Sequence, residues 1–192
     1  LGRGGFGTVD EVVYRVTNQT YARKIIPFNP RVKHSAEVEI LKQLHHLHIV
    51  NLAAFYPTSN QLWLLMSPVA EGNLASFLRD DGVSGVNSEI FWEWEGCLAS
   101  AVRYLHQAGL IHGDIKPQNI LVSSDLKVCL ADFGSARANH FEEGHENQTK
   151  PSLPLTPKYI APETSYYKVA GYTWSLRTAA DIFSLGCVWA EM

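Results

Sequence analysis

The sequence predicts an α+β fold in two lobes, a small lobe rich in β-strands followed by a helical one. Two patterns predict this division. Short runs of β-branched and aromatic residues separated by polar turns fill the first third of the chain, and apolar residues recur with helical spacing after residue 73. The 192 residues, 46% of them apolar, suffice for one substantial core or two small lobes. We expect lobes over residues 1–66 and 73–192, joined by a hinge at residues 67–72.

The first lobe is expected to contain four strands and one helix. The predicted order is a hairpin of two strands, a helix and two further strands, over residues 9–16, 21–26, 33–46, 49–55 and 61–66. The polar Thr-Asn-Gln at residues 17–19 suits the turn of the hairpin. Val38, Leu41 and Leu44 share one side of the predicted helix, so that side should face the core.

The second lobe is expected to be mainly helical. Six apolar residues follow i, i+3, i+4, i+7 spacing and predict a long helix: Trp94, Cys97, Leu98, Ala101, Val102 and Leu105. Gly109 suits the end of that helix. Two short strands are predicted at residues 120–123 and 127–131, followed by a polar loop at 138–157 and an apolar helix at 178–192.

Charge and cysteine content narrow the possible functions. A formal net charge of −3 provides no general basic field for nucleic acid or membrane surfaces. No apolar run is long enough to span a bilayer. The odd, widely spaced cysteines (Cys97, Cys129 and Cys187) favour a reducing interior, the cytoplasm or the nucleus, over a disulfide-linked secreted domain. Three neighbouring histidines are assigned to the turn after the first-lobe helix rather than to a metal site (His45, His46 and His48).

A glycine-rich segment opens the chain. Residues 1–9 read Leu-Gly-Arg-Gly-Gly-Phe-Gly-Thr-Val, a pattern typical of loops that cover nucleotide phosphates. The same glycine spacing occurs in dinucleotide-binding turns, but those continue into a helix and place an acidic residue about 20 positions on. This chain continues instead into a second strand that ends with Lys24-Ile25-Ile26-Pro27. The context therefore disfavours the dinucleotide interpretation.

Lys24 is a candidate phosphate-binding residue. It follows Ala22 by two positions, so both side chains point to one face of the predicted strand. Taken alone, Lys24 would be an ordinary exposed lysine. Glu37 changes this view, because it precedes Leu41 by four residues and so lies on the core-facing side of the helix. Glu39 is the alternative partner, but it lies about 200° around the helix from Glu37.

The segment from residue 112 to residue 134 carries the clearest chemical signal. It reads His112-Gly113-Asp114-Ile115-Lys116-Pro117-Gln118-Asn119 and, after a short apolar stretch, Asp132-Phe133-Gly134. A candidate base, a cation and two hard-oxygen ligands thus lie close together in sequence, which suits phosphoryl transfer from a metal-bound nucleotide. A lone Asp in a loop is more often a turn residue. With the glycine loop and Lys24, however, the set resembles the protein kinase family over essentially the whole chain.

The resemblance implies a role for each of these residues. It makes Asp114 the catalytic base, with Lys116 neutralising charge on the transferred phosphate. Asn119 and Asp132 would ligate Mg²⁺. The implied ATP-binding residues are Gly2, Gly4, Gly7, Val9, Ala22, Lys24, Glu37, Met66, Ser67, Val69 and Leu121. Among them Met66 would stand behind the adenine pocket, and the Ser67 carbonyl and Val69 amide would bond the adenine edge.

Further matches concern substrate and regulation. The Asp-x-Lys-Pro-x-Asn form and residues 156–163 resemble serine/threonine-directed kinases, with Thr156 contacting Asp114 and Lys116. His112 would join a buried stack with Leu41, Leu52 and Phe133, and Asp181 would hold the backbone of the catalytic loop.

Gly113 departs from the family pattern, because most members carry an arginine there that binds a phosphate on the activation segment. Two other basic residues of that pocket remain, Lys33 and Arg137. We expect phosphorylation at Thr149 or Ser152 to have at most a modest effect on activity. The activation segment is longer than usual and acidic in its middle (Glu142, Glu143 and Glu146), which is typical of a solvated loop.

These features predict an ATP-dependent protein serine/threonine kinase (EC 2.7.11 type) that acts on a protein hydroxyl. The alternative is a non-catalytic kinase-like scaffold or binding module. Only Gly113 and the missing parts of the domain favour this alternative. Small-molecule kinases are disfavoured by the peptide-docking segment at residues 156–163. The resemblance also implies a fragment, truncated at both ends of the kinase domain. Glu163 would then lack its usual arginine partner, and the isolated chain should be unstable and poorly active.

Overall fold

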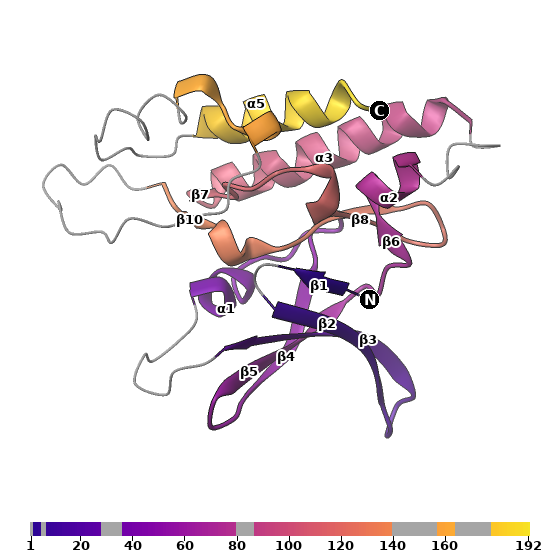
Figure 1. Cartoon of the computed structure of the whole chain (residues 1–192), viewed down its shortest axis with the longest axis vertical. Coiled ribbons are helices and arrows are strands. Elements are labelled where there is room, and N and C mark those ends of the chain that lie inside the picture. The colour runs from indigo at the N-terminus through magenta and orange to yellow at the C-terminus, as the bar shows by residue number, and fades with distance from the viewer. Residues whose placement is uncertain (1, 5–6, 28–35, 80–86, 140–156, 164–177) are drawn as a thin grey trace, which may run out of the picture.

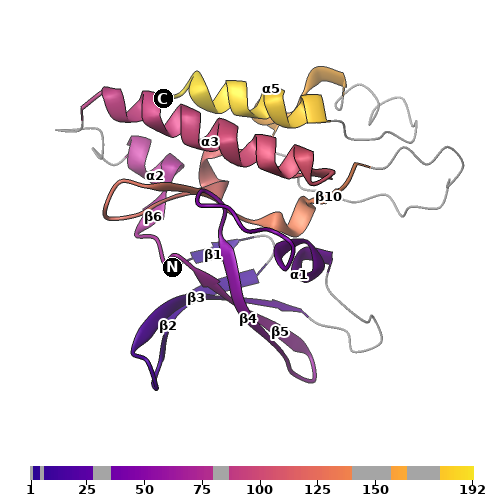
Figure 2. The same cartoon turned by 180° about the vertical axis from the view of Figure 1, so that it is seen from behind.

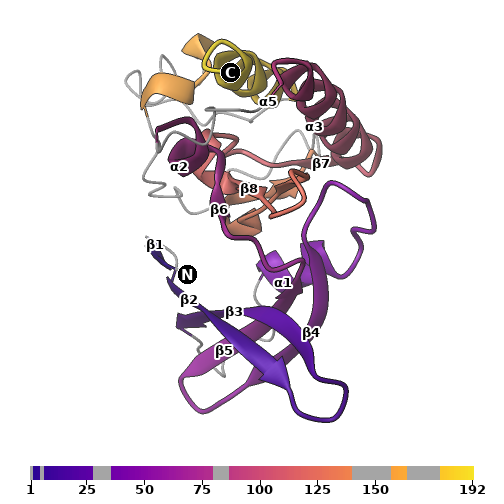
Figure 3. The same cartoon turned by 90° about the vertical axis from the view of Figure 1, so that its right-hand side faces the viewer.

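The computed structural model describes residues 2–4, 7–27, 36–79, 87–139, 157–163 and 178–192. Figure 1 shows a β-sheet at one end of the molecule and helices at the other, with α1 lying between them. The view from behind and the side view confirm this arrangement (Figures 2 and 3). The α+β, two-lobe prediction is therefore confirmed.

The first lobe is built on a five-stranded antiparallel sheet with the order β1-β2-β3-β5-β4. Its strands are β1 (Gly2–Gly4), β2 (Gly7–Tyr14), β3 (Gln19–Pro27), β4 (Asn51–Pro57) and β5 (Gln61–Ser67). The predicted hairpin is β2–β3, and its turn contains Asn18 with a positive φ of 57°, a conformation that Asn adopts more readily than most residues.

Helix α1 (Ala36–Leu41) ends earlier than the prediction of residues 33–46. Val38, Leu41 and Leu44 are all buried as expected, although Leu44 lies beyond the helix. After Leu41 the chain closes two tight i→i−3 hydrogen bonds and then joins β9, where the Leu130 amide donates to the His48 carbonyl at 2.9 Å. Tight turns therefore replace the predicted last turns of helix, and the backbone pairs with the second lobe only from residue 48 onward. The predicted start of the helix lies outside the described residues.

The second lobe combines helices with short strands. Its elements are β6 (Gly72–Asn73), α2 (Leu74–Arg79), α3 (Glu89–Gln107), β7 (Leu110–Ile111), η1 (Pro117–Asn119), β8 (Ile120–Val122), β9 (Val128–Leu130), η2 (Phe133–Ser135), β10 (Arg137–Ala138), η3 (Pro157–Tyr159) and α5 (Thr178–Trp189). Strands β6, β8 and β9 form one small sheet, and β7 and β10 form another. The two predicted strands correspond to β8 and β9, and the predicted final helix to α5.

Helix α3 is the scaffold of the second lobe. The predicted apolar stripe is buried except at Cys97, which is half-buried. The polar atom of buried Trp94 has a hydrogen-bond partner, because the indole N–H donates to the Leu126 carbonyl at 2.8 Å. The helix ends where Gly109 takes a positive φ of 70°, as the sequence predicts.

One hydrophobic core runs through both lobes. It includes Leu41 of α1, Leu64 of β5, Leu98 of α3 and Phe133 of η2. Because the lobes share this core, residues from both are held in fixed positions where they meet. Across the ranges that the structure describes, none of the helices combines the length and apolar character needed to cross a membrane.

Candidate active site

Lys24 lies where the two lobes meet. Its Nζ is 2.7 Å from Glu37 Oε1 of α1 and 2.7 Å from Asp132 Oδ1, which comes just before η2. The Lys24 side chain is only 7% exposed. One cation thus joins the strand β3, the helix α1 and the second lobe.

The structure decides between the two candidate glutamates on geometric grounds. Glu37 is buried and contacts Lys24, whereas Glu39 points to solvent and pairs with Lys42 at 2.8 Å. Glu37 and Glu39 therefore point in different directions from the helix, as expected from the rotation between their positions.

The electrostatic environment keeps Lys24 charged. Burial by itself would lower the pKa of Lys24, and it is the largest single effect. The charges of Glu37 and Asp132, with their hydrogen bonds to Nζ, together outweigh burial and raise the pKa above its ordinary value. The ammonium group is therefore held ready for an anionic ligand.

Asp132 adopts an unusual backbone conformation. Its φ of 61° and ψ of 75° fall in the left-handed region, which few residues other than glycine adopt. Strained backbone of this kind clusters at functional sites, where the surrounding structure imposes it. Here the flanking residues are tied down, because the Ala131 amide donates to the Asn119 carbonyl at 2.9 Å and Phe133 is buried. The carboxylate is thus aimed at Lys24.

Asp114, Lys116 and Asn119 form a second group of contacts. Lys116 Nζ lies 2.8 Å from Asp114 Oδ2. The Asn119 amide nitrogen donates to the backbone carbonyl of Asp114 at 2.8 Å and to its Oδ2 at 2.9 Å. These bonds hold the Asp114 carboxylate between a cation and an amide donor.

The donor set fits a divalent cation with oxygen ligands. The two hydrogen bonds from the Asn119 side chain to Asp114 both use its nitrogen, so the amide oxygen, the other branch of the planar group, is turned away from Asp114. Asp132 supplies carboxylate oxygens. Among the described residues, no group of three or more His, Cys, Asp or Glu side chains is placed to hold a metal ion. A pair of protein oxygens is nevertheless what Mg²⁺ commonly uses when phosphates and water supply its other ligands.

His112 has a structural position. It is fully buried, and its ring meets that of Phe133 at 4.9 Å in a T-shaped arrangement. Its Nδ1 accepts from the Asp114 amide at 3.2 Å, so Nε2 is the nitrogen that donates to the Ala131 carbonyl at 3.1 Å. Leu41 is buried in the same core, and Leu52 is partly buried against it.

Asp181 holds the start of this loop from behind. Its Oδ2 accepts from the His112 amide and its Oδ1 from the Gly113 amide, both at 2.9 Å. Gly113 has a φ of 78°, which glycine adopts without strain and which allows consecutive amides to converge on one carboxylate. His106 Nε2 also lies 2.9 Å from Oδ2. Sequence analysis missed His106, although its position four residues after Val102 places it at the edge of the buried stripe of α3.

The predicted adenine-side residues share one face of the sheet. The strand register places Val9 opposite Lys24 and Ala22 opposite Met66. Side chains at opposed positions point to the same face, so these four residues line one surface. Ser67 ends β5 and Val69 follows it, and Leu121 lies on β8 in the second lobe.

The glycine segment forms the edge of this surface. Gly2 and Gly4 lie on β1, and Gly4 pairs with Gly7 of β2. Gly7 has a φ of 142°, and a Cβ there would collide with the carbonyl oxygen of Ile25. Only glycine fits this position. The residues between β1 and β2 lie outside the described part of the chain.

Comparison with known proteins now decides the family. The sequence model of the protein kinase domain matches residues 1–192, the whole chain. The chain belongs to the protein kinase family.

Several relatives of this kinase domain are named serine/threonine-protein kinases. A "probable serine/threonine-protein kinase" of Dictyostelium discoideum is 33% identical over 198 residues, which cover 100% of this chain and 41% of that protein. The serine/threonine-protein kinase AtPK1/AtPK6 of Arabidopsis thaliana is also 33% identical, over 100% of this chain and 40% of the relative. The 3-phosphoinositide-dependent protein kinase B of Dictyostelium discoideum is 30% identical over 98% of this chain and 20% of the relative. The chain spans about two fifths or less of these relatives.

Several predicted features of this kinase domain lie outside the described residues. They are Lys33, Thr149, Ser152, Thr156 and the acidic residues Glu142, Glu143 and Glu146. Glu163 is described and is exposed. A charge in water needs no partner, so the destabilisation expected from a buried, unpaired Glu163 does not apply in this structure. Arg137 lies on β10, where burial lowers its pKa and the nearby Asp181 carboxylate opposes that effect.

Proposed function

We propose that this kinase domain is the catalytic core of an ATP-dependent protein serine/threonine kinase, which transfers the γ-phosphate of ATP to a protein hydroxyl. The observation that carries the proposal is the position of Lys24, 2.7 Å from a carboxylate of each lobe. A buried lysine held by two carboxylates is costly to maintain for stability alone. It is well placed, however, to bind an anionic group where the lobes meet.

In this proposal the residues of the sheet bind the nucleotide. Lys24, oriented by Glu37, pairs with phosphate oxygens, and the glycines Gly2, Gly4 and Gly7 allow the backbone to approach the phosphates. The shared face formed by Val9, Ala22 and Met66 packs on the adenine, with Leu121 on the opposite side. The Ser67 carbonyl and the Val69 amide bond the adenine edge.

Asn119 and Asp132 are the proposed Mg²⁺ ligands. Their oxygens fit the preference of this ion, and both side chains are oriented by bonds to neighbouring residues. Bound Mg²⁺ would supply positive charge that offsets the negative charge of the phosphates.

Asp114 is the proposed catalytic base. Its carboxylate accepts or orients the proton of the substrate hydroxyl, and the bonds from Asn119 and Lys116 fix its rotamer. Lys116, 2.8 Å from Asp114, can also reach charge that develops on the transferred phosphate. The Asp-x-Lys spacing and the names of the relatives support Ser or Thr as the acceptor.

We also propose the domain division expected above, with a first lobe over residues 1–66, a hinge at 67–72 and a second lobe from 73 to 192. An intracellular location, cytoplasmic or nuclear, belongs to the same proposal. It is supported by the free state of Cys97, Cys129 and Cys187. The substrate is a protein with an accessible serine or threonine.

The test is phosphate transfer by the full-length parent protein. Radiolabelled ATP and a generic basic protein are incubated with the parent, with and without Mg²⁺, beside Asp114→Asn as a matched variant. We expect Mg²⁺-dependent labelling of serine or threonine that Asp114→Asn abolishes. A folded parent that binds ATP but transfers no phosphate would instead support a non-catalytic scaffold.

A further inference from the structure

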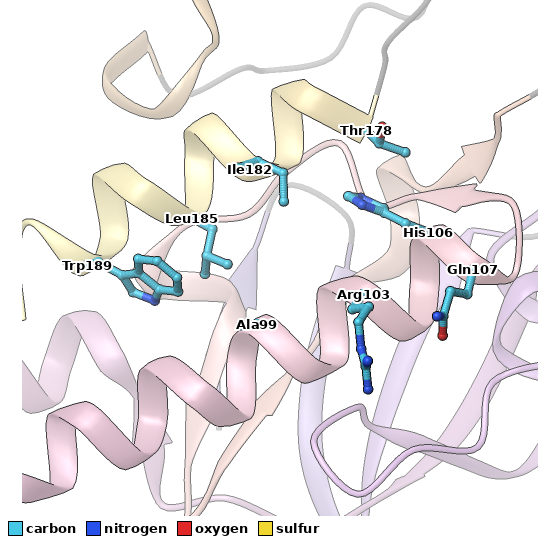
Figure 4. A pocket seen from close by; sticks show the side chains of 8 residues that line it. All are labelled: Ala99, Arg103, His106, Gln107, Thr178, Ile182, Leu185 and Trp189. Carbon is cyan, nitrogen blue, oxygen red and sulfur yellow. The ribbon is translucent and has the colours of Figure 1, made fainter.

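Helix α5 turns one face toward α3 and another toward η3. Figure 4 shows the first face, where three apolar side chains line the pocket between the two helices: Ile182, Leu185 and Trp189. On the second face, the Ser184 hydroxyl donates to the Tyr159 carbonyl of η3 at 2.7 Å. Glu191 comes seven residues after Ser184, so it follows the helix on this second face. Its carboxylate lies beside η3 and contacts Lys158.

Two residues of η3 hold the Glu191 carboxylate. Lys158 Nζ lies 2.9 Å from its Oε1. Burial, followed by a hydrogen bond to Glu191 and the charge of that carboxylate, raises the pKa of Tyr159 above its ordinary value. Tyr159 is 7% exposed, whereas the Lys158 side chain is 62% exposed. Glu191 is therefore held by one partner fixed in the core and by one that water surrounds.

A carboxylate is electrostatically unfavourable at this end of a helix. The carboxyl end of α5 carries partial negative charge, which attracts cations and repels anions. Glu191 lies two residues beyond the end of α5, and its side chain is 26% exposed. It therefore attracts a cation, and Lys158 supplies one by lying over the Tyr159 ring, with Nζ 5.6 Å from the ring centre. An ion pair with so exposed a lysine contributes little to stability, so stability does not account for it.

The pair of charges lies close to the catalytic loop. Ala161, two residues after Tyr159, packs with Ile111 and Ala180 in a small buried cluster. Ile111 comes three residues before Asp114, the proposed base. On the proposed function, the nucleotide occupies the face of the first-lobe sheet, which leaves the η3 side of Asp114 for the acceptor protein. An extended chain advances about 3.3 Å per residue, so residues that flank the acceptor hydroxyl come within reach of η3.

We propose that Lys158 is a specificity-determining residue for the acceptor protein. By occupying Glu191, Lys158 denies this carboxylate to a lysine or arginine of the incoming chain. The preferred acceptor sequence is therefore neutral or acidic at the position that faces Glu191, where the exposed ammonium group disfavours a basic residue. The inference rests on the proposed function, because it specifies the class of protein substrate.

The experiment measures phosphate transfer from ATP by the full-length parent to synthetic peptides with a single serine. Each flanking position carries alanine, lysine or glutamate in turn, and kcat/KM is compared between the lysine and alanine peptides. Lys158→Ala removes the counter-ion of Glu191, and Lys158→Arg retains it. Lys127→Ala is the matched control, because Lys127 is also an exposed lysine paired with a carboxylate, that of Asp125, but lies on the turn between β8 and β9.

In the wild type, lysine at any flanking position should give a kcat/KM no higher than alanine does. In Lys158→Ala, lysine at one flanking position should raise kcat/KM by about three- to fivefold, the size expected for a pair of partly exposed charges. Adding Glu191→Gln, which keeps an oxygen for the Tyr159 hydroxyl, should abolish this gain. Lys158→Arg and Lys127→Ala should behave like the wild type. A preference for lysine in the wild type, or none in Lys158→Ala, would overturn the proposal.

Peptide binding separates this inference from the proposed function. Fluorescence anisotropy of the same peptides, carrying a fluorescent label, does not require phosphate transfer. We expect Lys158→Ala, unlike the wild type, to bind one lysine peptide more tightly than the alanine peptide, by the same factor. If the parent shows this pattern but transfers no phosphate, only the kinase assignment fails. If Lys158→Ala binds the lysine and alanine peptides equally, the proposal fails even for an active kinase.

Discussion

Replacing Lys24 with methionine should destabilise the kinase domain far more than the same replacement of a solvent-exposed lysine. The change leaves Glu37 and Asp132 without the cation that now lies 2.7 Å from each. Breaking a buried ion pair by removing one partner costs about 3–5 kcal/mol. The Glu37 side chain is 6% exposed and that of Asp132 is 27% exposed, so water relieves part of the penalty at Asp132. We expect a loss of about 3 kcal/mol, a large part of a domain stability of about 5–15 kcal/mol.

Arg23→Met is the matched control, because Arg23 is the preceding residue of β3 and points to the other face. Its ion pair with Asp10, 2.9 Å between Nε and Oδ1, involves side chains 24% and 42% exposed. Such a partly exposed pair contributes about 0–1 kcal/mol. Equilibrium urea unfolding followed by tryptophan fluorescence gives both values. The reasoning is refuted if Lys24→Met is no more destabilising than Arg23→Met, or if adding Glu37→Gln to Lys24→Met recovers no stability.

Three further predictions concern groups away from the catalytic loop. Burial, together with nearby positive charge, lowers the pKa of His46 below 6.5. The stability that this contributes is complete above the pKa of His46 in the unfolded chain and is lost as pH falls through its pKa in the folded protein. In urea unfolding between about pH 5 and pH 7.5, the free energy of unfolding should therefore decrease as pH falls, and His46→Gln should reduce this dependence. Gly7→Ala should destabilise the domain by about 1–3 kcal/mol in the same assay, because of its φ of 142° and the collision of a Cβ with the Ile25 carbonyl. Burial raises the pKa of Cys129 to about 11, so mass spectrometry should find this thiol unmodified by iodoacetamide in the native protein and alkylated in urea; rapid native alkylation would contradict this.

Much of the first lobe could be predicted because its signals are local. Side chains return to the same face every two residues in a strand and about every 3.6 residues in a helix. Spacing alone therefore placed Lys24 on the same strand face as Ala22, and Glu37 on the core side of α1. The structure confirms both placements and excludes Glu39 as the partner of Lys24. These inferences needed no knowledge of residues distant in the chain.

The failures have a common physical cause, which is contact between distant segments. The predicted end of α1 at residue 46 was wrong because the chain leaves the helix in tight turns after Leu41 and pairs with β9 at residues 48–50. The strands β6, β7 and β10 were missed because each has two residues and is defined by its partner. The three-residue β1, which makes the first-lobe sheet five-stranded instead of four-stranded, was missed because its Gly-Arg-Gly sequence has little strand propensity of its own. The left-handed backbone of Asp132 likewise has no signal in its own side chain. The bonds that surround it impose this conformation.

The position of Lys24 also bears on how nucleotide and metal binding depend on each other. In the structure, the positive charge of Lys24 is fully engaged by Glu37 and Asp132. Phosphate groups that approach Lys24 therefore meet the Asp132 carboxylate, and like charges at this distance repel strongly where water is scarce. Asp132 can be relieved of that repulsion if its oxygens turn to a cation, and its 27% exposure leaves room for one. On the proposed function, Lys24 then keeps Glu37 as its protein partner and exchanges Asp132 for phosphate. On that proposal, the same carboxylate that stabilises the site without nucleotide would make ATP binding depend on Mg²⁺.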